Sequence, residues 1–455
     1  MTTQSLTNSN NMNVNEEYLL SLRAVRERCF KVQEAAVRNK LQHFDIDTSK
    51  LQDIVQFVIS IIKRDFDDPS KIPTHGRWRH FDADGYPRVQ TLINSWASLG
   101  IDKTEQTRRV LDLMVVAVIL DLNPSHNYSY QEASSGRLYK KKEGIAIAIL
   151  EMYMKGLFSA NPDQPHRVDS NAIMALQITD LLAGFKGTSE TLNDLEERFK
   201  LLKHLGHKLQ HCSDYFRNNE DQAFRPGNML DYILNHPTTI TTKKGPLILL
   251  ETIWPIILEI GELWSVPQTD PESNSDGATL TLGDVWSCPI ISCADQMVPF
   301  HKFSQWMLYS LIEPMEKMLG AMIEGTEQLT PLPDYANGGL LIDTGFITLK
   351  ASDFDRGIKN HKENSLLQGQ PKMEITPMFD ISDPVITEWR ALTIAYLDLV
   401  AERVRSVMNL NRRSLTLSQL MEGGTTSAGK ELAEISRPNT QEPPIIIKCD
   451  GVLIQ

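Results

Sequence analysis

The chain has 455 residues, of which 41% are hydrophobic and 23% are charged, a balance typical of globular proteins with a large buried core. Its formal net charge of −12 argues against nucleic acid as a partner, because phosphate contacts need a basic surface. The short basic run 140–142 is better explained as a solvated helix start than as a phosphate-binding patch.

The cysteine pattern and the terminal sequence indicate a cytosolic protein. Five scattered cysteines favour free thiols in a reducing compartment, and their spacing predicts no metal site and no other cofactor. The N-terminus is polar and lacks the apolar segment of a secretory signal. The most apolar run, 246–261, is interrupted by Glu251, Pro255 and Glu259, so it is too broken to cross a bilayer. We expect a soluble cytoplasmic protein without a membrane partner, and whether it also enters the nucleus by diffusion stays open.

The order of predicted elements indicates a mainly α fold. Residues 1–15 are rich in Asn, Thr and Ser and are predicted to be a disordered tail, followed by a single, mainly helical domain over residues 16–455. Helical periodicity starts near Glu16 and recurs along the chain, most clearly over 51–66, 104–122, 143–157, 169–184, 190–213, 226–235, 247–265, 298–323 and 384–408.

Strand patterns are sparse and come late in the chain. One candidate strand covers residues 338–349, and a second pattern covers 443–455, where Asp450-Gly451 is typical of a hairpin turn. The polar stretches 265–280 and 351–383 are expected to be loops. The fold class is therefore a large multi-helix globular body with a small β element near the C-terminus.

Near the C-terminus, Gly424, Gly429 and Lys430 have the spacing of a phosphate-binding P-loop. That motif needs a preceding strand and a Ser or Thr after the lysine, whereas Glu431 follows here and helical residues precede. We therefore expect an ordinary helix start near residue 427, capped by a threonine at 425 or 426. Whether this helix start also holds an anion stays open.

Two clusters combine polar, charged and aromatic residues in patterns that core packing does not require. The first, "HGRWRHFDADG", contains His75 and Arg77 in a non-periodic segment; it lines a cleft or forms a structural ion-pair cluster. The second follows Asp295 and continues along a predicted helix, where polar and aromatic side chains alternate at four-residue spacing. Its candidate site residues are His301, Lys302, Trp306, Tyr309 and Glu313.

A third cluster, "LPDYANGGLLIDTG", contributes two carboxylates. Asp334 precedes a glycine turn, and Asp343 lies within the candidate strand at 338–349. An aspartate among apolar strand residues needs hydrogen-bond partners. Asp343 therefore either holds loop backbone or faces a cleft.

The motifs, taken in order, resemble the uracil-catabolism protein 4 family of fungi and bacteria over nearly the whole chain from about residue 20. They are "HGRWRHFD", "KKEGIAIAILEM", "RPGNMLDYI", "LGDVW", "VPFHKFSQWMLYSLIEP", "LPDYANGGLLIDTG", "EWRALTIAYLD" and "EGGTTSAGK". The family pattern has an aromatic residue at the position of Thr426 and an arginine at that of Lys430. These departures weaken a special role for the glycine-rich loop.

The resemblance implies a part in pyrimidine degradation through a ribosylurea intermediate. A shorter likeness, "ADQMVP" at 294–299, is similar to queuosine-salvage nucleosidases. Those enzymes are all-helical, related in fold to helical DNA glycosylases, and use the aspartate of this stretch on a ribose.

These resemblances lead to the hypothesis of an N-ribosyl hydrolase that acts on a small nucleoside-like substrate, ribosylurea or its 5′-phosphate, and releases urea. Asp295 would stabilise the oxocarbenium-like ribose, with His301 or Asp343 as acid or base. Arg77 and Arg225 would hold a phosphate or urea oxygen. Two alternatives stay open: a non-catalytic or regulatory protein that binds a pyrimidine metabolite, and an amidohydrolase acting on an opened pyrimidine ring.

Overall fold

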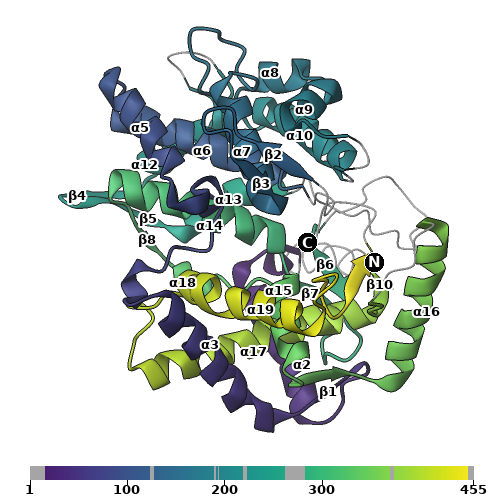
Figure 1. Cartoon of the computed structure of the whole chain (residues 1–455). Coiled ribbons are helices and arrows are strands. Elements are labelled where there is room, and N and C mark those ends of the chain that lie inside the picture. The colour runs from purple at the N-terminus through teal and green to yellow at the C-terminus, as the bar shows by residue number, and fades with distance from the viewer. Residues whose placement is uncertain are drawn as a thin grey trace, which may run out of the picture. The chain divides into compact units, whose positions relative to one another are not determined.

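The computed structural model describes residues 16–122, 128–188, 191–192, 194–218, 223–261, 282–368 and 374–448. The expected tail at 1–15, the loop at 265–280 and the turn at 450–451 lie outside these ranges. Helices predominate among the elements, which confirms the mainly α fold class (Figure 1). None of the described helices combines the length and the apolar character that crossing a membrane requires.

The chain forms two compact units, each made of separate stretches of sequence. Unit 1 comprises Met1–His75, Ser265–Gln305 and Glu327–Gln455, and unit 2 comprises Gly76–Trp264 and Trp306–Thr326. Beside this division, the expectation of one helical domain over residues 16–455 stays a prediction.

Unit 1 is organised around a long buried helix, α17 (Pro384–Met408), which packs against α2 (Leu22–Val37) and α3 (Leu51–Asp65). Asp383 caps α17, and Asn409 ends it in the left-handed conformation, as the start and stop signals of a helix require. A second contact joins α15 (Tyr335–Asp343) to α19 (Thr426–Ser436), visible as the green and yellow helices in Figure 1. Two further helices of the described part of this unit are α16 (Ala351–Gln368) and α18 (Leu417–Leu420).

Short pairs of hydrogen-bonded strands connect the segments of unit 1. They are β1 (Phe44–Ile46) with β9 (Ile347–Leu349), β6 (Val285–Ser287) with β7 (Met297–Pro299), and β10 (Met378–Asp380) with β11 (Ile446–Lys448). The first two pairs are antiparallel and the third is parallel. The strands are therefore distributed over distant parts of the chain. Two of the pairs join segments that are far apart in the sequence, and the pair of β6 and β7 closes one loop.

Unit 2 is built on α6 (Lys103–Ile119), which is buried on all sides from Val110 to Ile119, as expected of a helix in the centre of a core. Its other helices are α4 (Trp78–Phe81), α5 (Arg88–Ser98), α7 (Lys141–Met154), α8 (Ser170–Ala175), α9 (Ile178–Phe185), α10 (Leu195–His211), α11 (Ser213–Phe216), α12 (Met229–Asn235) and α13 (Leu250–Gly261). Helix α14 (Lys302–Leu319) supplies residues 302–305 to unit 1 and the rest to unit 2.

The strands of unit 2 form two small sheets. One is the antiparallel pair of β2 (Ser129–Gln131) and β3 (Leu138–Lys140). The other is a three-stranded sheet in which β5 (Gly245–Leu249) lies between β4 (Ile240–Thr242) and β8 (Met322–Glu324).

Two predictions of local structure were wrong. Residues 335–343 are helical, because Asp334 caps them, and strand β9 is limited to residues 347–349. The expected loop at 351–383 contains helix α16.

Helix α19 starts at Thr426, close to the start expected near residue 427, but the expected threonine cap was wrong: Thr425 makes no capping hydrogen bond, because α18 and a π-helical turn (Met421–Thr425) run directly into α19. An added Cβ at Gly429 would lie 1.9 Å from the Ala336 carbonyl oxygen. A glycine at this position therefore allows α19 to pack closely against α15, because any larger residue would clash with α15.

Candidate functional site

Asp295 precedes strand β7 in unit 1 and is held by an arginine from α2. Arg28 Nη1 and Nη2 donate to Oδ1 and Oδ2 of Asp295 over 2.7 and 2.8 Å, and the Met297 amide donates to Oδ1 over 3.2 Å. The Arg28 side chain is nearly enclosed, whereas that of Asp295 keeps 19% of its surface exposed. The bidentate pair fixes the plane of the carboxylate. Asp295 is thus an oriented acceptor that stays partly open to solvent.

Strand β7 is bracketed by two residues in strained backbone conformations. Gln296 has φ 50° and His301 has φ 44°, in the left-handed region that is unfavourable by roughly 1–2 kcal/mol for residues other than glycine. Such strain persists only where the surrounding structure enforces it, and it clusters at functional sites. Here it lies on both sides of the "MVP" strand that follows Asp295.

The buried ring of His301 has a defined tautomer. Its Nε2 lies 2.8 Å from the carbonyl oxygen of Leu19, and since a carbonyl only accepts, Nε2 carries the hydrogen. Burial lowers the pKa of His301 below its usual value. The ring is therefore neutral at pH 7, with its lone pair on Nδ1, which suits a base better than an acid.

Asp284 and Arg390 form a buried ion pair beside this segment. Arg390 Nη1 and Nη2 donate to Asp284 over 2.8 and 2.7 Å, and the amide of Lys302 donates to the same carboxylate over 3.1 Å. Burial alone would raise the pKa of Asp284, but the Arg390 charge overcomes that effect and lowers it. The pair was not among the predicted site residues. Its signal was a charged residue in each of two family motifs, "LGDVW" and "EWRALTIAYLD".

Asp343 and Asp334 lie at the two ends of α15. Asp343 Oδ1 and Oδ2 accept from Nη1 and Nη2 of Arg437 over 2.8 and 2.6 Å, which ties the end of α15 to the residue that follows α19. Asp334 Oδ1 caps α15 by accepting from the Asn337 amide over 2.8 Å. Each carboxylate has a contact that explains it structurally, and the predicted catalytic and binding roles stay predictions.

His75 pairs with a glutamate of the π-helical turn. Its Nδ1 lies 2.8 Å from Glu422 Oε2, and its amide donates to Ser418 Oγ over 2.6 Å. Both members of the pair are buried, and π-helical turns occur frequently at functional sites. Sequence reasoning missed Glu422, although it stands in the "EGGTTSAGK" motif.

In unit 2, the segment that begins with Arg77 contacts helix α14, so two of the predicted clusters meet. The Arg77 amide donates to Ser310 Oγ over 3.1 Å. The rings of His80 and Trp306 meet edge to face, with centroids 6.2 Å apart.

Further along α14, Tyr309 and Glu313 lie against Gly76, the residue before this segment. An added Cβ at Gly76 would lie 3.2 Å from the Tyr309 carbonyl oxygen and 3.3 Å from Glu313 Oε2. Lys317 Nζ is 2.6 Å from Glu313 Oε1 and 4.5 Å from the ring centroid of Trp78. Tyr309 and Glu313 therefore pack closely, and their predicted roles as ligands stay predictions.

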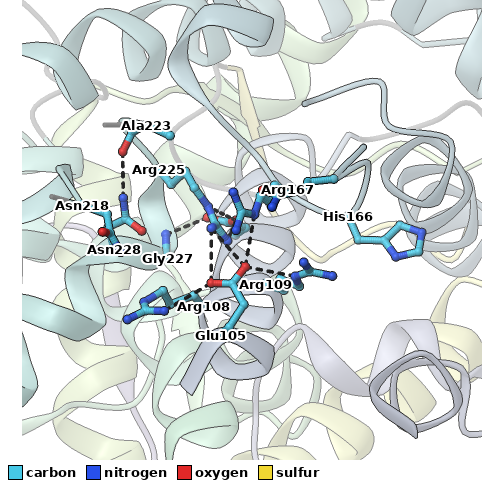
Figure 2. Close-up of polar contacts among 12 residues, drawn as sticks. Glu105, Arg108, Arg109, His166, Arg167, Asn218, Ala223, Arg225, Gly227 and Asn228 are labelled. Carbon is cyan, nitrogen blue, oxygen red and sulfur yellow. Dashed lines mark hydrogen bonds and ion pairs between the residues drawn. The ribbon is translucent and has the colours of Figure 1, made fainter. Parts of the chain in front are cut away.

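Arg225, the remaining predicted ligand, belongs to an ion-pair cluster in unit 2 (Figure 2). Its Nε and Nη2 donate to Asp112 Oδ2 over 3.0 and 2.8 Å, and its Nη1 donates to Glu105 over 3.1 and 3.3 Å. Burial opposes ionisation of Glu105, but the nearby arginines, Arg225 first, lower its pKa to about 2. Glu105 also accepts from Arg108, Arg109 and Arg167.

Each nitrogen of Arg225 thus has a carboxylate partner, an arrangement typical of a structural ion pair. Across the described ranges, no group of three or more His, Cys, Asp or Glu side chains is placed to hold a metal ion. The predicted catalytic residues Asp295, His301 and Asp343 all belong to unit 1, as do His75, Lys302 and Asp334. The other predicted ligands belong to unit 2: Arg77, Arg225, Trp306, Tyr309 and Glu313.

Comparison with known proteins places these residues in a family. The family model described as protein of unknown function (DUF1688) matches residues 18–454. The chain is 34% identical over 447 residues to protein urg3 of Schizosaccharomyces pombe, and 32% identical over 453 residues to uracil catabolism protein 4 of Lachancea kluyveri. Both alignments cover 96% of this chain and 98% of the relative. They confirm the resemblance found in the motifs.

Proposed function

The chain belongs to the DUF1688 family, and we propose that it acts in uracil catabolism, the process named in its Lachancea kluyveri relative. The proposed reaction is hydrolysis of the N-ribosyl bond of ribosylurea, or of its 5′-phosphate, with release of urea. The observation that carries the proposal is the pair of Asp295 and Arg28 beside the strained strand β7.

The pair supplies what the reaction requires near the sugar. Breaking an N-glycosidic bond builds positive charge on C1′ and O4′ of the ribose, and a carboxylate of fixed orientation stabilises that charge or binds the hydroxyl groups. Arg28 fixes the orientation of Asp295 through two hydrogen bonds. The left-handed backbone conformation of Gln296, the residue after Asp295, supports the proposal, since such conformations persist where the surrounding structure enforces them.

His301 has the chemistry of the base in this proposal. Water adds its oxygen to C1′ while one of its protons moves to Nδ1 of the neutral ring. The C1′–N bond breaks and its electron pair passes to the ureido nitrogen, which takes up a proton from solvent and leaves as urea, while Nδ1 releases its proton to solvent. The lowered pKa of His301 keeps the ring ready to accept a proton at neutral pH. Asp343, held by two donors from Arg437, is the weaker choice for this role.

The test is urea release from synthetic ribosylurea, with and without a 5′-phosphate. Asp295→Asn should fold with an unchanged circular dichroism spectrum and lose about 100-fold or more in kcat, the range for removal of one electrostatic stabiliser. Turnover of Asp295→Asn at the wild-type rate would remove Asp295 from the mechanism.

Asp398→Asn is the matched control, since it neutralises a carboxylate of the same unit that also accepts two hydrogen bonds from one arginine, Arg26. Its kcat should stay within a few-fold of wild type. A loss in Asp398→Asn equal to that in Asp295→Asn would mean that weakening an ion pair, and not removing a catalytic group, explains both.

One observation favours the alternative of a non-catalytic protein that binds a pyrimidine metabolite. Both Asp295 and Asp343 are in bidentate arginine pairs, and such pairs also serve purely structural roles. Under this alternative, calorimetry would detect binding of ribosylurea while no urea is released by wild-type protein.

A further inference from the structure

Three buried arginines of unit 2 differ in the hydrogen-bond acceptors of Nε and Nη2, the two nitrogens on one side of the guanidinium group. In Arg88, these nitrogens donate to the two oxygens of Glu132 over 2.7 and 3.1 Å. In Arg225 they donate to Asp112. The two parallel N–H groups on this side match the two oxygens of a carboxylate or a phosphate.

Arg77 has the same two donors without a protein acceptor. The residue is fully buried, and its Nη1 donates to Asp121 Oδ1 over 2.9 Å. Its Nε and Nη2 are buried, and no hydrogen-bond partner for them exists among the described residues. Buried donors without acceptors are rare, and each needs an explanation, such as a bound ion or ligand.

The side chains around Arg77 also carry an excess of positive charge, which favours the binding of an anion. Lys142 Nζ lies 3.2 Å from the same Asp121 oxygen that accepts from Arg77. The charge of Arg198 adds to that of Arg77 and Lys142 at this carboxylate. A single aspartate therefore faces three cations, and Asp194 is hydrogen-bonded to one of them, Arg198, over 3.3 Å.

We propose that the cluster of Arg77, Lys142 and Arg198 in unit 2 is a binding site for a phosphate group, held by the Nε and Nη2 donors of Arg77. A phosphate carries up to two negative charges and three acceptor oxygens, so it neutralises the excess positive charge more completely than a carboxylate. Lys142 and Asp121 are partly exposed, with 37% and 19% of their side-chain surface accessible.

The site neither requires nor excludes the proposed hydrolase activity, and its occupancy is measured without turnover. Inorganic phosphate is titrated into wild-type protein at constant ionic strength, and binding is followed by calorimetry. Sodium acetate serves as the carboxylate probe, and ribose 5-phosphate as the phosphate ester. We expect saturable binding of phosphate and at least tenfold weaker binding of acetate. Tighter binding of ribose 5-phosphate than of phosphate would identify an ester as the ligand, and the reverse order would identify free phosphate; both support the site.

Arg77→Lys should weaken phosphate binding by tenfold or more, because a lysine cannot present two parallel donors. Lys142→Gln changes a partly exposed side chain, so it should fold even if Arg77→Lys does not, and it should weaken binding several-fold. Arg88→Lys is the matched control: it alters a buried arginine whose Nε and Nη2 are already bonded and should leave the phosphate affinity unchanged.

Two results would overturn the proposal. One is equal phosphate affinity in wild type, Arg77→Lys and Lys142→Gln. The other is acetate binding as tight as phosphate binding.

Discussion

The surroundings of Arg225 and Arg77 are the most informative comparison within unit 2. Both guanidinium groups are almost completely buried, and the sequence nominated both to hold a phosphate or a urea oxygen. Arg225 meets Glu105 (Figure 2) and also Asp112, so each of its nitrogens has a carboxylate partner. Arg77 meets Asp121 through Nη1, and its other two nitrogens have no partner among the described residues.

The difference teaches that burial does not reveal the use of an arginine, whereas the number of acceptors does. A guanidinium surrounded by carboxylates has its hydrogen-bonding capacity filled by the protein and contributes to folding. One with buried, unfilled donors has capacity left for a ligand.

The largest expected effect is the loss of Arg225. Arg225→Met leaves the fully buried Asp112 without its cation, so we expect the free energy of unfolding to fall by about 3–5 kcal/mol. Urea denaturation followed by circular dichroism measures the change. Arg64→Met, which removes exposed ion pairs, should change stability by less than about 1 kcal/mol. A loss for Arg225→Met as small as that would show that the cluster in Figure 2 is not structural.

The next effect is acid destabilisation through Glu105. Its pKa is lowered from 4.5 to about 2 in the folded chain, so its contribution is fully present above pH 4.5 and is lost as the pH falls toward 2. The loss amounts to at most roughly 3 kcal/mol. Glu105→Gln should be less stable at pH 7, and its stability should depend less on pH between 5 and 2. Glu34→Gln, which alters an exposed ion pair, should retain the wild-type slope, and an unchanged slope in Glu105→Gln would contradict the prediction.

Removing Arg77 should matter less for folding than removing Arg225. In phosphate-free buffer, Arg77→Met should lower the free energy of unfolding by about 2 kcal/mol or less. Asp121 keeps Lys142 at 3.2 Å, and the substitution also removes two buried donors that lack acceptors. Urea denaturation alongside Arg225→Met tests this difference directly. An equal loss of unfolding free energy in the two variants would show that the two arginines contribute equally to folding.

The smallest effect concerns His166, next to the Arg225 cluster in Figure 2. Trp96 Nε1 donates to His166 Nδ1 over 2.8 Å, and burial together with the Arg109 charge lowers the pKa of the ring. The contribution of His166 is present above pH 6.5 and is lost as the pH falls through the lowered pKa, by less than about 1 kcal/mol. An NMR titration should place its pKa below 6.5, and Trp96→Phe should raise it. Titration above 6.5 in the wild type would show that the ring is not held neutral.

Most of the helical content could be read from the sequence, because long periodic segments define their own buried face. The pattern over 384–408 coincides with α17 (Pro384–Met408). Residues 338–349 were misread because a short apolar run with two glycines fits strand and helix alike. Contacts with distant residues decided the outcome: Gly338 lies so close to the Trp389 ring that an added Cβ would clash with it at 2.8 Å.

The candidate site was predictable only in part. By their density of functional groups, the sequence nominated Asp295, His301 and His75 of unit 1 and Arg77 of unit 2, whose roles stay predictions. It missed Glu422, since the partner of His75 lies 347 residues away, and no local pattern reports such a contact.

By itself, the sequence determined the helical class, the family and the motifs that carry the polar residues, because these depend on periodicity and on residue type. Only the tertiary structure decided which polar groups neutralise one another. Asp295 met Arg28, Asp343 met Arg437 and Arg225 met Asp112 across large separations in sequence, whereas the Nε and Nη2 of Arg77 met no described acceptor. The reason is physical: the state of a buried charge depends on the atoms within a few ångströms of it, and folding alone brings those atoms together.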